Sequence, residues 1–267
     1  EAQARSEAAL QLREAEGLVG DAMDAEIHGT LAMLHMQQRR PAGMQAEFDR
    51  ALAILRAMDP VDEQQLAHLL RTAGEMRGDL GDVGGPQALF AEARTLVERN
   101  YPADHPEPIN LLRAMCRDAQ RRDDLAAATR HCDDAWQRAQ RVFARPHHQR
   151  AVIAATLAQC HLARGDFAAA LPLLAQADGE FAEVLPPNHP LRGRLALERA
   201  LADLHAGDPV AARGHADAAL ASLQAAAAPP EELAEPTLLL RVLDCNAAPD
   251  DARRAAVAAT LQTVLAR

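Results

Sequence analysis

The chain has 267 residues and a net charge of −10; 49% of its residues are hydrophobic and only 3% are aromatic. Nucleic-acid phosphates require a basic surface, and an acidic chain with no cluster of arginines in a single helix does not provide one. No stretch approaches the length of about 18 continuous apolar residues that a membrane-spanning helix requires. The abundant alanine favours closely packed helices over strands.

The first 20 residues form a charged segment that we expect to be helical. Its first 18 residues, EAQARSEAALQLREAEGL, lie outside the periodic pattern of the rest of the chain. Two interpretations stay open for residues 1–20: a linker helix that connects the chain to a preceding domain, or an N-terminal cap.

Polar turns recur at a constant interval in residues 21–267. Gly165-Asp166-Phe167 and Gly207-Asp208-Pro209 are 42 residues apart (207 − 165). Steps of the same length reach four further turns: Arg39-Arg40-Pro41, Gly81-Asp82-Val83, Asp123-Asp124-Leu125 and Pro249-Asp250-Asp251. A second series, about half a period away, runs through His105, His147 and His189. Two interleaved series in register indicate an internal repeat.

Each half-period has the periodicity of a helix. Between His148 and Gly165, apolar residues such as Ile153 and Leu157 recur at steps of three and four. Glycine can end the first helix in a left-handed conformation, and the following aspartate can cap the second. The unit is therefore an antiparallel helical hairpin, and we expect six: about 21–60, 61–103, 104–146, 147–187, 188–229 and 230–267.

Small residues recur at two positions of the repeat and indicate where helix backbones touch. Seven residues before the turn stand Ala32, Gly74, Cys116, Ala158 and Ala200, and twelve after it stand Ala51, Ala93, Ala135, Ala177 and Ala219. Bulkier residues fill the neighbouring position, nine after the turn: Phe48, Phe90, Cys132, Leu174 and Ala216. The sixth unit departs from this pattern with Val242 and Leu261, as terminal repeats often do.

The Gly-Asp turn, the aromatic Phe167 and the alanine columns together resemble the tetratricopeptide repeat, and the 42-residue period resembles its kinesin-light-chain-like variety. The resemblance implies an all-α fold: a right-handed α-solenoid of about six antiparallel hairpins, with an extra N-terminal helix. In the second unit, Gly84-Gly85-Pro86 predicts a late start of the second helix. The resemblance also implies a non-catalytic protein-interaction module, of the kind found in bacterial multidomain signalling proteins such as Ser/Thr kinases.

We expect no catalytic residues, no metal and no cofactor. The chain has no phosphate-binding loop, nucleophile elbow or dinucleotide fingerprint. The four cysteines lack CxxC spacing and are expected to be reduced, buried thiols. The alternative, a zinc site built from His131-Cys132, Cys160-His161 and Cys116, is less favoured because two of these cysteines lie on core columns.

The first helix of each hairpin lines the inner face in this family, and we expect a protein or peptide segment to bind there. The 42-residue repeat places four arginines of the second and third units on this face, next to apolar residues of the fourth and fifth. Arginine favours carboxylates, so the segment would be acidic and apolar. The alternative is that these arginines pair with neighbouring carboxylates. The candidate residues are Arg71, Arg113, Arg117, Gln120, Arg121, Gln159, Leu162, Leu197 and Leu201.

Two other functions stay open at this point. The chain could self-associate, for example as a homodimer, and organise an assembly, or it could control an attached enzyme such as a kinase. We expect no nucleic-acid partner and no membrane insertion by these residues. The compartment is also open: cytoplasmic, or periplasmic if a transmembrane helix precedes these residues in the parent protein.

Overall fold

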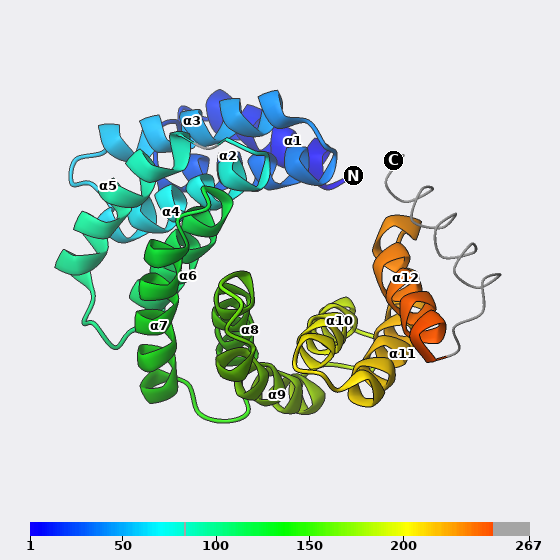
Figure 1. The fold of residues 1–267 in the computed structure, drawn as a ribbon. Helices are drawn as coiled ribbons and strands as arrows, with labels where there is room; N and C mark the ends of the chain where they lie inside the picture. Colours follow the sequence, from blue (N-terminus) through cyan, green and yellow to red (C-terminus); the bar gives the residue numbers. More distant parts are fainter. Residues whose placement is uncertain (83, 248–267) are drawn as a thin grey trace. The chain divides into compact units, whose positions relative to one another are not determined.

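The computed structural model describes residues 1–82 and 84–247, and these residues form twelve helices without a strand (Figure 1). The contacts divide the chain into two compact units, Glu1–Arg138 and Ala139–Arg267. Unit 1 contains α1 (Ala2–Ala15), α2 (Ala22–Gln37), α3 (Pro41–Ala57), α4 (Glu63–Asp79), α5 (Gly85–Asn100), α6 (Pro106–Arg121) and most of α7 (Leu125–Val142). Unit 2 contains α8 (His148–Ala163), α9 (Phe167–Val184), α10 (Pro190–His205), α11 (Pro209–Ala225) and α12 (Pro230–Ala247).

Consecutive helices pack as hairpins, which confirms the predicted all-α repeat. In unit 1, α2 packs on α3 and α4 on α5, and contacts of α3 with α4 and of α5 with α6 join successive hairpins. In unit 2, α8 packs on α9 and α10 on α11, and α12 packs on α11. The predicted second helix of the sixth hairpin, with Leu261, lies outside the described residues. No described helix has the length and hydropathy needed to cross a membrane.

The turns between the two helices of each hairpin have the predicted chemistry. In the five hairpins whose turns the structure describes, a residue with positive φ follows the first helix: Arg39, Gly81, Asp123, Gly165 and Gly207. Asp166 Oδ1 then accepts a hydrogen bond from the Ala169 amide at 3.1 Å, and Asp208 Oδ1 accepts one from Ala211 at 2.9 Å. These carboxylates cap the second helices, as expected.

The histidines at the half-period turns also have a structural role. His105, His147 and His189 each accept, through Nδ1, a hydrogen bond of 3.2 Å from the amide two residues later. Each therefore caps the helix that begins at the next residue, α6, α8 or α10. Pro106 and Pro190 start two of these helices, where a missing amide proton leaves no hydrogen bond unmade. Similarly, α5 begins late, at Gly85, as predicted.

The two small columns lie in the core. Every alanine that the repeat pattern assigns to these two columns is 0% exposed in the structure. Gly74 shows why the column excludes larger residues, because a Cβ atom placed there would lie 2.6 Å from Cε1 of Phe90. Phe90 is the bulky residue of the same repeat, so a large side chain on one helix fits where its partner helix has almost none.

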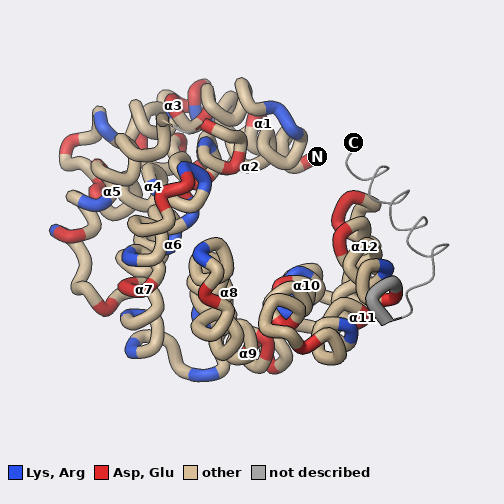
Figure 2. The backbone as a smooth tube through the Cα atoms, viewed as in Figure 1, with Lys and Arg blue, Asp and Glu red and all other residues tan. Residues whose placement is uncertain are grey.

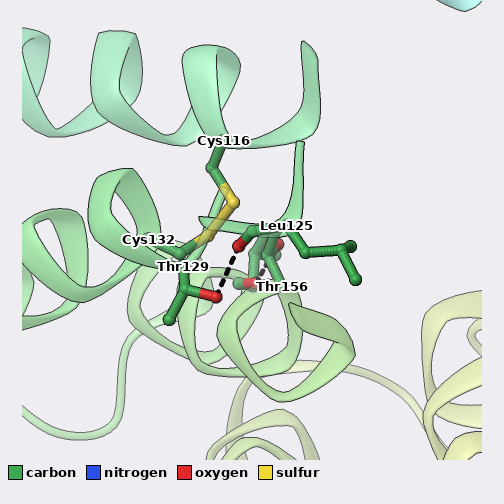
Figure 3. The surroundings of a disulfide bond; sticks show 6 residues. Cys116, Leu125, Thr129, Cys132 and Thr156 are labelled. Atoms are coloured by element: carbon green, nitrogen blue, oxygen red, sulfur yellow. Dashed lines mark hydrogen bonds between the residues drawn. A yellow bond between two sulfur atoms is a disulfide. The ribbon is translucent and has the colours of Figure 1, made fainter. Parts of the chain in front are cut away.

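A disulfide corrects the prediction that the cysteines are reduced thiols. Cys116 of α6 and Cys132 of α7 are bonded, with their Cα atoms 5.4 Å apart (Figure 3). The two residues occupy the small and the bulky column of the third repeat, the positions held by Gly74 and Phe90 in the second. Facing core positions bring the two sulfurs together, and the bond leaves neither as a thiolate ligand for zinc. Cys160 is buried and is not part of this bond.

We expect protein purified under oxidising conditions to contain at most two free thiols, because two of its four cysteines form this bond. Reduction should lower the free energy of unfolding by about 3 kcal/mol, the value typical of a closed loop of about 15 residues. Thiol titration in denaturant, followed by urea unfolding with and without reductant, measures both quantities.

The double variant Cys116→Ser/Cys132→Ser is the control, because reductant should not change its stability. Four reactive thiols in the oxidised, denatured wild-type protein would contradict the disulfide.

Candidate partner-binding surface

The first helices of the second and third hairpins, α4 and α6, share a buried network of charged side chains. Arg71, which is 7% exposed, donates from Nε to Glu107 and from Nη1 to Glu75, both at 2.8 Å. Arg113 donates to the other oxygen of Glu75, also at 2.8 Å. Two of the four predicted arginines are thus held by carboxylates of the chain itself.

The remaining two arginines of this face share a single carboxylate. Arg117 donates to Asp79 Oδ1 at 3.1 Å, and Arg121 pairs with the same oxygen. Four arginines therefore face three carboxylates, Glu75, Asp79 and Glu107, which leaves a net charge of +1 on this part of α4 and α6 (4 − 3). Figure 2 shows charged segments of both signs on α4 and α6. The side chain of Arg117 is the more exposed of the two, at 38%.

The network changes the acidity of its members. Burial alone would raise the pKa of Glu107, but the neighbouring His68 and the Arg71 guanidinium outweigh it and lower the pKa to about 2. Burial also lowers the pKa of Arg113, with Glu75 opposing and the nearby Arg117 and Arg71 adding to the effect. The ionised form of Glu107 is consequently the form that stabilises the fold.

Replacing Glu107 with Gln should lower the free energy of unfolding at pH 7 by about 1–3 kcal/mol, since Arg71 loses a buried partner. In the wild type this contribution is present above pH 4.5, the ordinary pKa, and is lost as pH falls towards 2. Between these values, the stability of Glu107→Gln should therefore change less with pH. Urea unfolding from pH 3 to pH 7 tests both expectations.

Glu98→Gln is the matched control, because Glu98 pairs with Arg94 across an exposed helical turn. Its stability should change by less than about 0.5 kcal/mol. A Glu107 variant that is as stable as this control at pH 7 would rule out the network as a stabilising element.

In unit 2, the predicted residues of the first helices differ in exposure. Gln159 of α8 is exposed and Leu162 is half-buried. On α10, Leu201 is 40% exposed, whereas Leu197 is 8% exposed and packs in a core cluster with Ala200 and Ala216. Leu197 is therefore mainly a core residue, and Gln159, Leu162 and Leu201 are the accessible ones.

Glu198, on α10 of unit 2, has unusual surroundings that the sequence pattern did not predict. Gln159 Nε2 donates to Glu198 Oε1 at 2.6 Å and links α8 to α10. Glu198 Oε2 is buried and has no hydrogen-bond partner among the described residues. Burial raises the pKa of Glu198 to about 7, although the hydrogen bond from Gln159 opposes the shift.

Because its folded-state pKa is raised, Glu198 favours the folded state below pH 4.5 and loses that contribution as pH rises through about 7. Glu198→Gln keeps the acceptor for Gln159 without a charge. We expect this variant to be more stable than the wild type at pH 8, by about 1–3 kcal/mol, and nearly equal to it at pH 4.

Thermal unfolding at both pH values checks this prediction, with Glu183→Gln as the control at an exposed site of α9. An equal effect of the two substitutions at pH 8 would show that Glu198 carries no unfavourable charge.

In the structure the predicted residues lie on first helices, as the repeat pattern implies. The repeat pattern did not predict the partners of their side chains. Asp79, Glu75 and Glu107 decide how much positive charge the α4–α6 face keeps. Glu107 is 36 residues from Arg71 and Arg117 is 38 from Asp79, so nearly one repeat separates each pair. A carboxylate one period away on the neighbouring first helix is the signal that could have identified these pairs.

Comparisons with solved structures agree with this architecture. BtubC (BKLC) from P. vanneervenii is 16% identical, with a TM-score of 0.68 over 83% of this chain and 89% of that one. A kinesin light chain with TPR-like repeats from Podosopora anserina is 18% identical, with a TM-score of 0.60 over 75% of this chain and 96% of that one.

A Rap protein complexed with Competence and Sporulation Factor is 14% identical, with a TM-score of 0.71 over 96% of this chain and 69% of that one. No protein-family model and no curated protein sequence matches the chain. At these identities the similarity concerns the fold. The chain is a tetratricopeptide-like array of helical hairpins, of the kind seen in kinesin-light-chain-like repeats.

Proposed function

We propose that the chain is a non-catalytic interaction module that binds an acidic and apolar peptide-like segment on the first-helix face of unit 1. The observation that supports it is the single carboxylate of Asp79 between Arg117 and Arg121. Two guanidinium groups with one carboxylate retain donors for a second carboxylate, and arginine binds such groups in a fixed fork geometry.

The other arginines of the face serve a different purpose. Arg71 and Arg113 are held by Glu75 and Glu107 in a nearly closed network, so they support the surface and leave recognition to Arg117 and Arg121. Apolar contacts would come from residues next to this network on the same helices. One of the similar structures is a complex with Competence and Sporulation Factor, which shows that a chain of this fold can hold another molecule.

Randomised twelve-residue peptides displayed on phage test the proposal, with the full chain as bait. Peptides that the wild-type protein enriches should contain Asp or Glu together with apolar residues. The double variant Arg117→Gln/Arg121→Gln should bind them at least about tenfold more weakly, the loss expected when one charge-assisted hydrogen bond is removed.

The matched control is Arg56→Gln, which removes an exposed arginine from the second-helix layer, where it pairs with Glu92. Equal binding by the control and the double variant would place the peptide elsewhere. Failure of the wild-type protein to enrich any peptide would count against peptide binding itself.

The wider proposal is that this module is a partner-binding or sensor segment of a larger bacterial signalling protein, such as a Ser/Thr kinase. The gene sequence on either side of these residues tests it, since a kinase domain would be recognised at once.

Self-association is the second candidate, and the N-terminal region supports it. Helix α1 buries no residue. Large apolar side chains of this region are exposed: Leu12 at 62%, Leu18 at 50%, Val19 at 63% and Met23 at 50%. Exposed apolar groups gathered in one region often mark a contact surface. Sedimentation of the wild type and of Leu12→Ser/Val19→Ser separates the candidates, since a dimer that depends on these residues favours assembly.

A further inference from the structure

A pocket on the first-helix face of unit 1 adjoins the network of arginines, because His68, one of its lining residues, lies within hydrogen-bond distance of Arg71. It opens between α2 and α4, has a volume of about 250 Å³, and is floored by Phe48 and Leu55 of α3. These two residues are 1% and 0% exposed, so the pocket reaches the core of the first hairpin. Leu69 of α4 and the exposed Met33 of α2 form apolar walls.

A glycine creates this pocket. Gly29 stands ten residues before the turn of its repeat, at the position that holds Arg71, Arg113, Ala155 and Leu197 in the next four repeats. The missing side chain leaves space in front of Leu69, whose Cδ1 atom would lie 3.5 Å from a Cβ atom at Gly29. That distance is an ordinary van der Waals contact, so no close backbone approach requires a glycine here. The pocket is therefore a gap in an otherwise filled column.

The size of the pocket fits one large side chain. An apolar cavity of about 150 Å³ accommodates benzene, and this pocket is larger and open to solvent. Sites for whole small molecules usually have volumes of about 300–1,000 Å³. A phenylalanine or leucine side chain presented by a peptide matches the volume and the lining.

The charge at the rim is negative. Glu26 is the only carboxylate among the lining residues, no arginine lines the pocket, and Glu26 has no ion-pair partner among the described residues. The other titratable residue of the lining is His68, whose Nδ1 lies 3.0 Å from Nη2 of Arg71. Arg71 is already neutralised by Glu75 and Glu107. A cation beside the apolar group of a ligand would thus face an unpaired carboxylate.

We propose that this pocket anchors a large apolar side chain of the bound segment, with an arginine or lysine of that segment next to it, paired with Glu26. The inference rests on the proposed peptide-binding function and specifies its anchor. It also gives the segment a polarity, since its basic end would lie over α2 and its acidic end over Arg117 and Arg121.

The pocket can be tested without a peptide by using phenethylammonium, which joins a phenyl ring to a cation. Titration of the full chain should shift the methyl signal of Met33 in a saturable manner and leave that of Met115, on α6, unchanged. 3-Phenylpropionate, with the opposite charge, should bind at least about threefold more weakly. Glu26→Gln should abolish this preference, because it removes the carboxylate that distinguishes the two probes.

Two substitutions at Gly29 provide matched variants. Gly29→Leu fills the pocket and should abolish the phenethylammonium shift, whereas Gly29→Ala adds one methyl group and should reduce the affinity less than about threefold. Both replace a helical glycine with a better helix former, so both should remain folded. The proposal that this pocket binds an apolar group would be wrong if the Met33 signal shifted equally in the wild type and in Gly29→Leu, or did not shift in the wild type.

The peptides enriched by phage display separate this proposal from the more general one. They should carry Phe or Leu beside Arg or Lys, and Gly29→Leu should lower their affinity at least about tenfold relative to Gly29→Ala, as expected for one large buried side chain. Peptides that depend on Arg117 and Arg121 but bind Gly29→Leu normally would refute the anchor and leave the peptide-binding function intact.

Discussion

The close approach of two helix backbones at the small columns is the constraint on which each fully described hairpin depends. In the first, second and fourth repeats a small residue of the first helix stands sixteen positions before a bulkier one of the second, and Gly74 faces Phe90 in this way. Interiors are packed to crystal-like density, so the pair must conserve volume and neither member can change alone. The disulfide between Cys116 and Cys132 is one solution to the same problem, in which a covalent bond replaces van der Waals contact.

Once the backbones are fixed in this way, the faces of the first helices are free to vary, and the two units use this freedom differently. In unit 1, ion pairs link α4 to α6, and the nearly buried Arg71 binds two carboxylates. In unit 2, a hydrogen bond from Gln159 to Glu198 links α8 to α10. Buried carboxylates thus occur in both, with pKa values shifted in opposite directions because only one has a cationic partner.

The turns, caps and columns could be predicted from the sequence because each depends on neighbours in the chain or on a strict period. Gly165 and Asp166 specify their turn locally, and Ala158 was assigned to the core from its place on the lattice alone. Side-chain pairing across nearly a full repeat could not be predicted in this way. The repeat pattern predicted the helix face on which Arg71 lies, but not the carboxylates with which Arg71 pairs. It also predicted that Leu197 lines the groove, whereas most of this side chain is buried in the core.

For the cysteines, too, the repeat pattern predicted the positions of the residues but not the bond between them. The sequence assigned Cys116 and Cys132 correctly to core columns, but it treated them as separate thiols. Their separation of 16 residues equals that of Gly74 and Phe90, which touch in the preceding repeat. The contact was therefore implied by the repeat, and only the possibility of a bond between two sulfurs had to be added.

Gly29 shows how a repetitive array can acquire a distinctive feature by losing atoms. The column that it occupies accepts an arginine, an alanine or a leucine in other repeats, so the fold does not depend on the identity of this residue. A codon change at Gly29 alone could close the cavity while the backbone contacts stay intact, because a Cβ atom there meets its nearest neighbour at an ordinary contact distance. Selection can in this way add or remove an anchoring cavity at one repeat without an intermediate that fails to fold.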